Sequence, residues 1–161
     1  MKSSIYIRAV KGTGLVDRLI RARTGSPYSH VEFAYPFVGS RVYRPSWLGS
    51  QPHGGVQVRP YDYLGTVQYD LFAISVPQST LELVRAAAGS MIGDPYSFAS
   101  IFDDIAAGLA RLGRRRYDCS GFVTTALARG GVHLFNDSIK GKLITPRDVA
   151  INGKLVLMER R

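Results

Sequence analysis

The sequence contains a single cysteine, Cys119, among its 161 residues. No intramolecular disulfide can form, so the fold should depend on packing rather than on the bridges of small secreted domains. No apolar run reaches the roughly 18 residues of a membrane-spanning helix. The N-terminal segment MKSSIYIRAVKGTG also lacks the apolar stretch of a secretory signal. We therefore expect a protein that is cytoplasmic as synthesised, and leave open release by lysis, as for a phage-encoded enzyme, or by a dedicated export route.

Recognisable cofactor and metal motifs are missing as well. One cysteine and three dispersed histidines offer no zinc-ligand spacing, and there is no nucleotide-binding loop or dinucleotide fingerprint. We predict neither a metal nor a cofactor. Internal repeats, low-complexity segments and linkers are also lacking, so residues 1–161 are predicted to form a single domain whose oligomeric state the sequence does not indicate.

What the sequence does contain is an ordinary globular composition with a basic surplus. Apolar residues make up 45% and charged residues 20%, and the net charge is +9. Such a surface attracts polyanions, including nucleic acid, anionic lipid and cell-wall polymer. The one tight basic run is Arg114–Arg116. Because no nucleic-acid-binding motif accompanies it, a basic nucleic-acid-binding module is kept only as an alternative.

Hydrophobic periodicity places strands mainly in the first half of the chain and helices in the second. This order predicts an α+β domain with a small antiparallel sheet packed against helices. The helices that start after residue 117 have clear caps, Asp118 for one and Thr145 followed by Pro146 for the other. The predicted strands are 4–10, 29–35, 40–44, 55–61, 67–76 and 154–160, and the predicted helices are 15–25, 80–93 (capped by Ser79 or Thr80), 97–113, 118–131 and 145–152.

Cys119 lies in the segment YDCSGFV, at the first turn of the predicted helix 118–131. Backbone N–H groups and the helix dipole stabilise negative charge there, which favours the nucleophilic thiolate. The N–H of Cys119 can also face a developing oxyanion. A lone cysteine is more often a small buried apolar residue, but the flanking Asp118 and Ser120 favour a reactive role.

A thiolate nucleophile needs a base, and His30 is the best candidate. It begins the predicted strand 29–35, which gives a rigid platform. Glu32 is two residues further along, so its side chain points to the same face and could orient the imidazole. His53, in a Gly/Pro loop, is predicted to be exposed, and His133 is predicted to be structural.

Three segments together resemble a known family. YDCSGFV is similar to the nucleophile signature of the NlpC-type, papain-like cysteine peptidases. IGDPYSFAS is similar to the Gly-x-Pro-Tyr segment that precedes this signature, and GSPYSHVEFAY is similar to the segment with the catalytic histidine. Here the histidine comes 89 residues before the cysteine. This order, together with GLVDRLIRARTGSPYSH and LITPRDVA, resembles the circularly permuted branch that includes relatives of lecithin–retinol acyltransferase.

The resemblance implies a circularly permuted papain-like fold in which the cysteine helix abuts the sheet. It implies that Cys119 is the nucleophile and that His30 accepts its proton. It also implies that Asp118 and Ser120 help to bind the free amino end of a substrate, and we add the adjacent Tyr117 to this set.

The third catalytic residue departs from the family pattern. The family has a polar residue on the strand after the histidine strand, but the chain reads SRVYRPSW near there, and the guanidinium of Arg44 accepts no hydrogen bond. We assign Glu32 to the role, with Ser46 or a backbone carbonyl as alternatives.

The sequence therefore predicts a cysteine hydrolase that cleaves amide bonds through an acyl-enzyme, in bacterial cell-wall peptides above all. An acyltransferase or thioesterase-like enzyme acting on lipids is the alternative, and it requires an apolar groove. Trp47, expected in a loop, is the candidate to line the substrate cleft, whereas Phe98, Phe102 and Phe122 are expected in the core.

Overall fold

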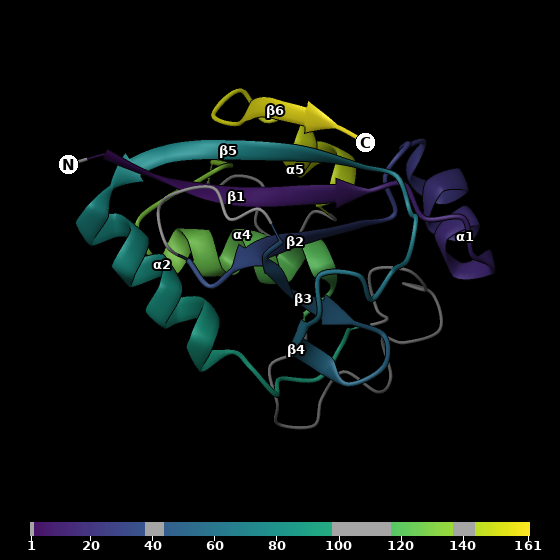
Figure 1. The fold of residues 1–161 in the computed structure, drawn as a ribbon, viewed down its shortest axis with the longest axis horizontal. Coiled ribbons are helices and arrows are strands. Elements are labelled where there is room, and N and C mark those ends of the chain that lie inside the picture. The colour runs from purple at the N-terminus through teal and green to yellow at the C-terminus, as the bar shows by residue number, and fades with distance from the viewer. Residues whose placement is uncertain (1, 38–43, 98–116, 137–143) are drawn as a thin grey trace.

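The computed structural model describes residues 2–37, 44–97, 117–136 and 144–161. Within them the chain forms a mixed α+β arrangement of one sheet and several helices (Figure 1). The strands are β1 (Lys2–Val10), β2 (His30–Tyr35), β3 (Ser46–Gln51), β4 (Gly55–Arg59), β5 (Tyr69–Pro77) and β6 (Val156–Arg160). The helices are α1 (Leu15–Thr24), α2 (Gln78–Ser90), α4 (Cys119–Arg129) and α5 (Pro146–Ala150).

The six strands form an antiparallel sheet in the order β4-β3-β2-β1-β5-β6. β1 therefore lies in the middle, with β2 on one side and β5 on the other. In the β1–β2 pairing Arg8 is opposite Glu32, and Val10 is opposite His30. The sheet thus brings the predicted base and its neighbouring carboxylate beside the first strand of the chain.

The hydrophobic core lies between the sheet and helices α2 and α4. Alternate residues of the central strands, such as Ile7, Val31 and Phe33, are buried in it. Phe122 of α4 is fully buried and makes an edge-to-face contact with Phe33, which confirms its predicted core position. Because side chains alternate along a strand, Arg8 and Glu32 point to the opposite face of the sheet.

The loop predicted after residue 44 was wrong, because part of it is a strand. The pattern at 40–44 predicted a strand and the following segment a loop, but β3 runs over Ser46–Gln51. Residues 40–43 lie outside the described residues, and Arg44 lies outside any strand. Ser and Gly made β3 read as a loop, yet its Trp47 and Leu48 are among the most buried residues of the sheet.

The predicted helix starts were partly right. Asp118 caps α4, its carboxylate accepting the Gly121 N–H at 2.5 Å, and Thr145 caps α5 ahead of Pro146. The predicted cap of α2 was wrong, because the helix begins at Gln78, directly after β5. The predicted helix 97–113 lies almost entirely outside the described residues.

Helices α2 and α4 approach each other closely at Gly130. A Cβ atom at this position would lie 2.2 Å from Val84 Cγ2 and 2.8 Å from the Val84 backbone nitrogen. Gly89 of α2 is different, because a Cβ there would meet nothing within 4 Å. These two glycines make a matched pair for testing the helix packing.

We expect Gly130→Ala to lower the free energy of unfolding by about 1–3 kcal/mol, because the backbone of α2 must move to admit the methyl group. Gly89→Ala should instead raise it by roughly 0.5–1 kcal/mol, because alanine is the better helix former. Urea unfolding followed by circular dichroism measures both. Equal effects in the two variants would contradict the close approach.

Candidate active site

The candidate nucleophile, Cys119, is the first residue of α4 and is 5% exposed. Its sulfur lies 3.9 Å from the hydroxyl oxygen of Ser120. The capping carboxylate of Asp118 fixes the first turn of the helix, so the thiol is held at the positive end of the helix dipole. A thiol in this place is positioned to react from its thiolate form.

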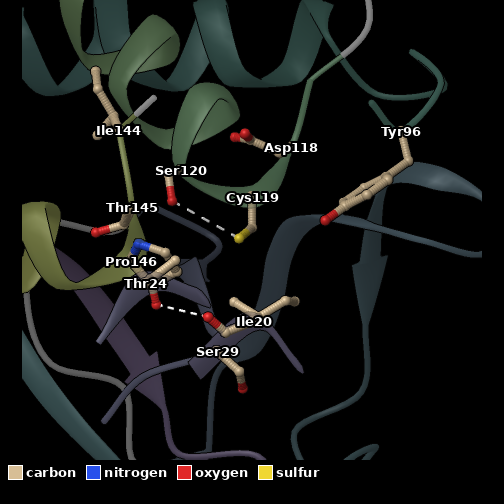
Figure 2. A pocket seen from close by; sticks show the side chains of 10 residues that line it. All are labelled: Ile20, Thr24, Ser29, Tyr96, Asp118, Cys119, Ser120, Ile144, Thr145 and Pro146. Atoms are coloured by element: carbon tan, nitrogen blue, oxygen red, sulfur yellow. Dashed lines mark hydrogen bonds between the residues drawn. The ribbon is translucent and has the colours of Figure 1, made fainter. Parts of the chain in front are cut away.

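A pocket opens at Cys119 (Figure 2). Asp118, Cys119 and Ser120 form one side of it, Ile20 and Thr24 of α1 contribute from another element, and the segment before α5 contributes a third wall. Among the described residues the lining is Ile20, Thr24, Ser29, Tyr96, Asp118, Cys119, Ser120, Ile144, Thr145 and Pro146. The sulfur is therefore reachable by a small group that enters from solvent.

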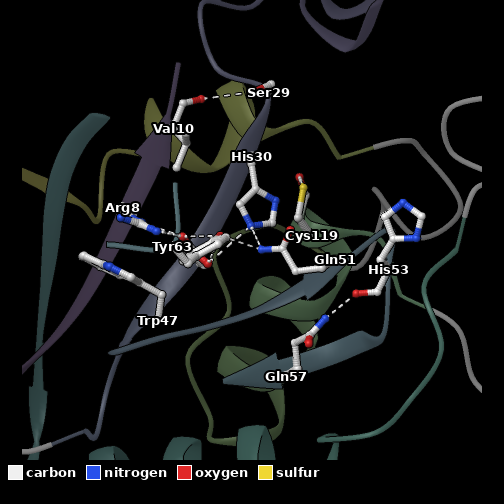
Figure 3. Close-up of polar contacts among 12 residues, drawn as sticks. Arg8, Val10, Ser29, His30, Trp47, Gln51, His53, Gln57, Tyr63 and Cys119 are labelled. Atoms are coloured by element: carbon white, nitrogen blue, oxygen red, sulfur yellow. Dashed lines mark hydrogen bonds and ion pairs between the residues drawn. The ribbon is translucent and has the colours of Figure 1, made fainter. Parts of the chain in front are cut away.

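His30 lies beside Cys119 at the start of β2 (Figure 3). Burial favours the neutral ring, but the interaction with Cys119, and after it that with Glu32, outweighs burial and raises the pKa of His30 to about 10. The ring atom Nε2 faces Glu32 and Gln51, which leaves Nδ1 for the thiol. The His30 ring therefore carries its second proton at neutral pH, beside the Cys119 sulfur.

Glu32 is fully buried and holds the imidazole from the side away from Cys119. Its Oε2 lies 3.5 Å from His30 Nε2, and its Oε1 lies 2.5 Å from both Nε and Nη2 of Arg8. Burial alone would raise the pKa of Glu32, but His30 and then Arg8 lower it. The predicted pairing of Glu32 with His30 is confirmed as a contact; its catalytic role stays a prediction.

Two residues of this network were not predicted, Tyr63 and Gln51. The Tyr63 hydroxyl donates to Glu32 at 3.0–3.1 Å and accepts from the Gln51 amide at 2.7 Å. The same amide nitrogen lies 2.8 Å from His30 Nε2. Gln51 can therefore donate to Nε2 only in the neutral tautomer that carries no proton on that atom, whereas Glu32 stabilises the doubly protonated ring.

Gln51 was missed because it ends β3, the strand whose sequence read as a loop. It is nevertheless the polar residue on the strand next to the histidine strand. The signal that could have found it is the β2–β3 register, in which Phe33 pairs with Leu48. Continuing that register places Gln51 opposite His30. Tyr63, in the turn after β4, carries no such signal in the sequence.

Gly49 makes room for this arrangement. A Cβ atom at Gly49 would lie 2.8 Å from Glu32 Cβ and 3.3 Å from His30 Nε2. Any side chain there would displace the carboxylate or the imidazole. The glycine that weakened the strand pattern is therefore required by the packing around the base.

The predicted substrate-binding residues separate into two groups. Asp118 and Ser120 line the pocket, whereas Tyr117 does not. The Tyr117 carbonyl accepts from the buried Ser50 hydroxyl at 2.6 Å, and its phenol accepts from Arg129 at 3.2 Å. Tyr117 thus fixes the approach to α4 and is not part of the pocket wall.

Trp47 is a correction to the sequence-based prediction. It does not lie in a loop or line the pocket, but is 1% exposed on β3. The guanidinium carbon of Arg8 lies 3.7 Å from the centre of its ring, and its indole donates to the Tyr61 carbonyl at 3.1 Å. Its work is to cover the buried charges of Arg8 and Glu32.

The remaining candidates lie apart from the site or outside the described part of the chain. Ser46 pairs with Tyr35, at the far end of β2 from His30, which removes it as the third residue. His53 is exposed as predicted, and His133 is exposed too, its carbonyl accepting from Lys154. Phe98, Phe102 and the basic run 114–116 lie outside the described residues.

Tyr96 is a further pocket residue that sequence reasoning did not single out. It is 7% exposed and lines the pocket, with its ring extending toward Cys119 (Figure 2). Burial raises the pKa of its phenol, and the neighbouring Cys119 and Asp118 raise it further. The phenol therefore keeps its proton at neutral pH and can donate a hydrogen bond into the pocket. The signal was present in the segment IGDPYSFAS.

Comparison with known proteins gives a fold relationship. No family model and no curated protein sequence matches the chain. One similar solved structure is that of the metalloprotein yiiX from Escherichia coli O157:H7, a DUF1105 protein. It aligns with a TM-score of 0.70 at 16% identity, over 99% of this chain and 97% of that one. At this identity the likeness supports the shared fold alone.

The described residues contain neither a cluster of metal ligands nor a membrane-spanning helix. Within those residues, no group of three or more His, Cys, Asp or Glu side chains is placed to hold a metal ion. Nor is any helix of the described part of the chain long and apolar enough to cross a membrane.

The pKa of His30 gives the first test of the site. In an NMR pH titration its imidazole should keep its proton to about pH 10, instead of losing it near 6.5. In Cys119→Ala the pKa should fall, because the contribution that raises it most is removed while burial remains. His30→Ala assigns the resonance among the three histidines. Titration near 6.5 in both proteins would contradict the pair.

The buried ion pair gives a second test. Arg8→Met leaves the Glu32 carboxylate buried without its arginine partner, and we expect the free energy of unfolding to fall by about 3–5 kcal/mol. Arg85 is the control, since it lies 3.8 Å from Glu82 with both side chains about half exposed. Arg85→Met should change the stability by less than about 1 kcal/mol. Similar losses in the two variants, measured by urea unfolding, would count against the network.

Proposed function

We propose that the protein is a cysteine-nucleophile hydrolase of amide bonds, with bacterial cell-wall peptides as its substrate class. The observation that carries this proposal is the thiol–imidazole pair: Cys119 at a helix N-terminus, beside His30, whose ring is held by the buried Glu32. A base oriented by a third group is the arrangement that activates a nucleophile. The order of histidine before cysteine further supports a permuted papain-like architecture.

The proposed reaction has two steps. The Cys119 thiolate attacks the amide carbonyl carbon, and the imidazolium of His30 gives its proton to the leaving amine. Water, deprotonated by the now neutral His30, then attacks the thioester and releases the acid and the thiol. Glu32 stabilises the charged ring, so the network favours the stages in which His30 carries the second proton.

The oxyanion formed in each step needs hydrogen-bond donors. The backbone N–H of Cys119 at the start of α4 is one, and the protonated phenol of Tyr96 across the pocket is a second. Asp118 gives the pocket a carboxylate that can meet the free amino group of a short peptide. This acidic group favours peptides with a free amino end as substrates.

A second candidate function is hydrolysis or transfer of acyl groups on lipids. One observation favours it: Ile20, Ile144 and Pro146 give the pocket apolar lining beside the thiol. The chemistry at Cys119 and His30 is the same, and only the acyl donor differs. Assays of the same preparation on peptide stems and on short acyl esters would therefore separate the two candidate functions, according to which substrate is hydrolysed.

The proposal predicts fast alkylation of Cys119 by iodoacetamide at pH 6, where an ordinary cysteine, of pKa about 8.5, is almost wholly protonated. We expect His30→Ala to slow this reaction at least about tenfold at pH 6, because the positive partner of the thiolate is lost. His53→Ala and His133→Ala are matched controls on exposed histidines and should react like the native protein. Intact mass measures the rate.

Substrate assays complete the test. Peptide-stem fragments of peptidoglycan should be cleaved by the native protein and left intact by Cys119→Ala. If His30→Ala and His53→Ala are alkylated at the native rate, the paired mechanism fails. If alkylation follows His30 but neither peptides nor acyl esters are cleaved, the hydrolase assignment fails while the pair stands.

A further inference from the structure

Helix α1 presents an apolar face to solvent next to the pocket. Leu15 is 77% exposed, Val16 51% and Leu19 53%, and no side chain of the helix is buried. A ten-residue helix is marginal in water by itself, and most helices gain their stability by burying an apolar face. We therefore expect the exposed apolar face of α1 to be covered by a partner that lies outside the described part of the chain.

The apolar residues of α1 form two adjacent stripes. Leu15, Leu19 and Ala22 follow one another at helical spacing. Val16 and Ile20 form the second stripe beside them, and Arg23 is the next residue along it. Ile20 also lines the pocket at Cys119. The exposed face is therefore continuous with the pocket wall.

The charges of α1 indicate which partner fits. The helix carries Arg18, Arg21 and Arg23 but a single acid, Asp17, which accepts the N–H of Gly14 at its own N-terminus. Arg23 continues an apolar stripe, a position that would leave a cation in the dry centre of a protein interface. At a lipid headgroup layer its long side chain can instead reach the phosphates while the stem stays in the apolar region.

We propose that α1 docks on an anionic lipid surface, with its leucine face inserted at the level of the headgroups and its arginines on the lipid phosphates. An amphipathic helix with a basic polar side is suited to this role, and the net charge of +9 adds long-range attraction. Because Ile20 belongs to both the helix and the pocket, docking sets the pocket next to the membrane surface. The proposal does not depend on the reaction at Cys119.

Hydrogen bonds fix the segment before the helix and the start of the helix. The Gly12 N–H donates to the Ser29 hydroxyl at 3.1 Å, and Arg21 donates to the Gly12 carbonyl at 3.2 Å. Gly25 ends the helix in the left-handed conformation, with φ of 58°.

The test is sedimentation of the full chain with vesicles of phosphatidylglycerol and phosphatidylcholine in equal parts. We expect binding that weakens as salt rises, and at least about tenfold weaker binding for Leu15→Ser/Leu19→Ser, since each leucine loses its apolar contact. Leu83→Ser, at a leucine of α2 that is 58% exposed, is the matched control and should bind like the native chain. Cys119→Ala should also bind like the native chain, which separates this proposal from the hydrolase proposal.

A second measurement reads insertion directly. Leu15→Trp should show a blue shift of tryptophan emission when vesicles are added, and Leu83→Trp should show none. The proposal is overturned if the native chain does not bind, if Leu15→Ser/Leu19→Ser binds as tightly as the native chain, or if the two tryptophan variants respond alike. A dimer in sedimentation velocity that Leu15→Ser/Leu19→Ser abolishes, without vesicle binding, would assign the face to a second copy instead.

Discussion

The arrangement around the candidate site depends on one buried carboxylate. Glu32 is completely removed from solvent, which is costly for a charge unless cations and donors surround it. Arg8 on one strand, His30 on its own strand and Tyr63 from the turn after β4 supply them. Trp47 closes the cluster over Arg8. The position of His30 is therefore set by its contact with Glu32 as well as by its contact with Cys119.

This constraint also explains why β1 is central. The first strand contributes Arg8 directly opposite Glu32, and its other alternate residues build the core beneath α2 and α4. The site therefore assembles from chain segments near residues 8, 30, 50 and 119. The charge network lies on one face of the sheet and the apolar core on the other, so the central strands β1 and β2 contribute side chains to both.

The sequence was informative where local chemistry and spacing decide the structure. The cap at Asp118, the strand at His30 and the shared face of His30 and Glu32 all follow from local rules, and the structure has them. β3 could not be predicted from its own residues. Gly49 is needed because Glu32 and His30 of β2 leave no room for a Cβ atom, and Trp47 is buried because it stacks on Arg8 of β1. The roles of Gln51 and Tyr63 become apparent only from their contacts with His30 and Glu32, which are distant in the sequence. Tyr117 could not be separated from Cys119 by sequence position alone. Cys119 lines the pocket, whereas the Tyr117 carbonyl binds Ser50 of β3 and its phenol binds Arg129 of α4.

The hydrogen bond from Ser50 to the Tyr117 carbonyl ties together the two halves of the site. Ser50 is next to Gln51, and Tyr117 is two residues before Cys119, so this one contact at 2.6 Å links the strand that holds the imidazole to the segment that enters the nucleophile helix. A displacement of β3 is thereby transmitted to the start of α4. The contact thereby helps to keep the base and the nucleophile in register, as the reaction requires.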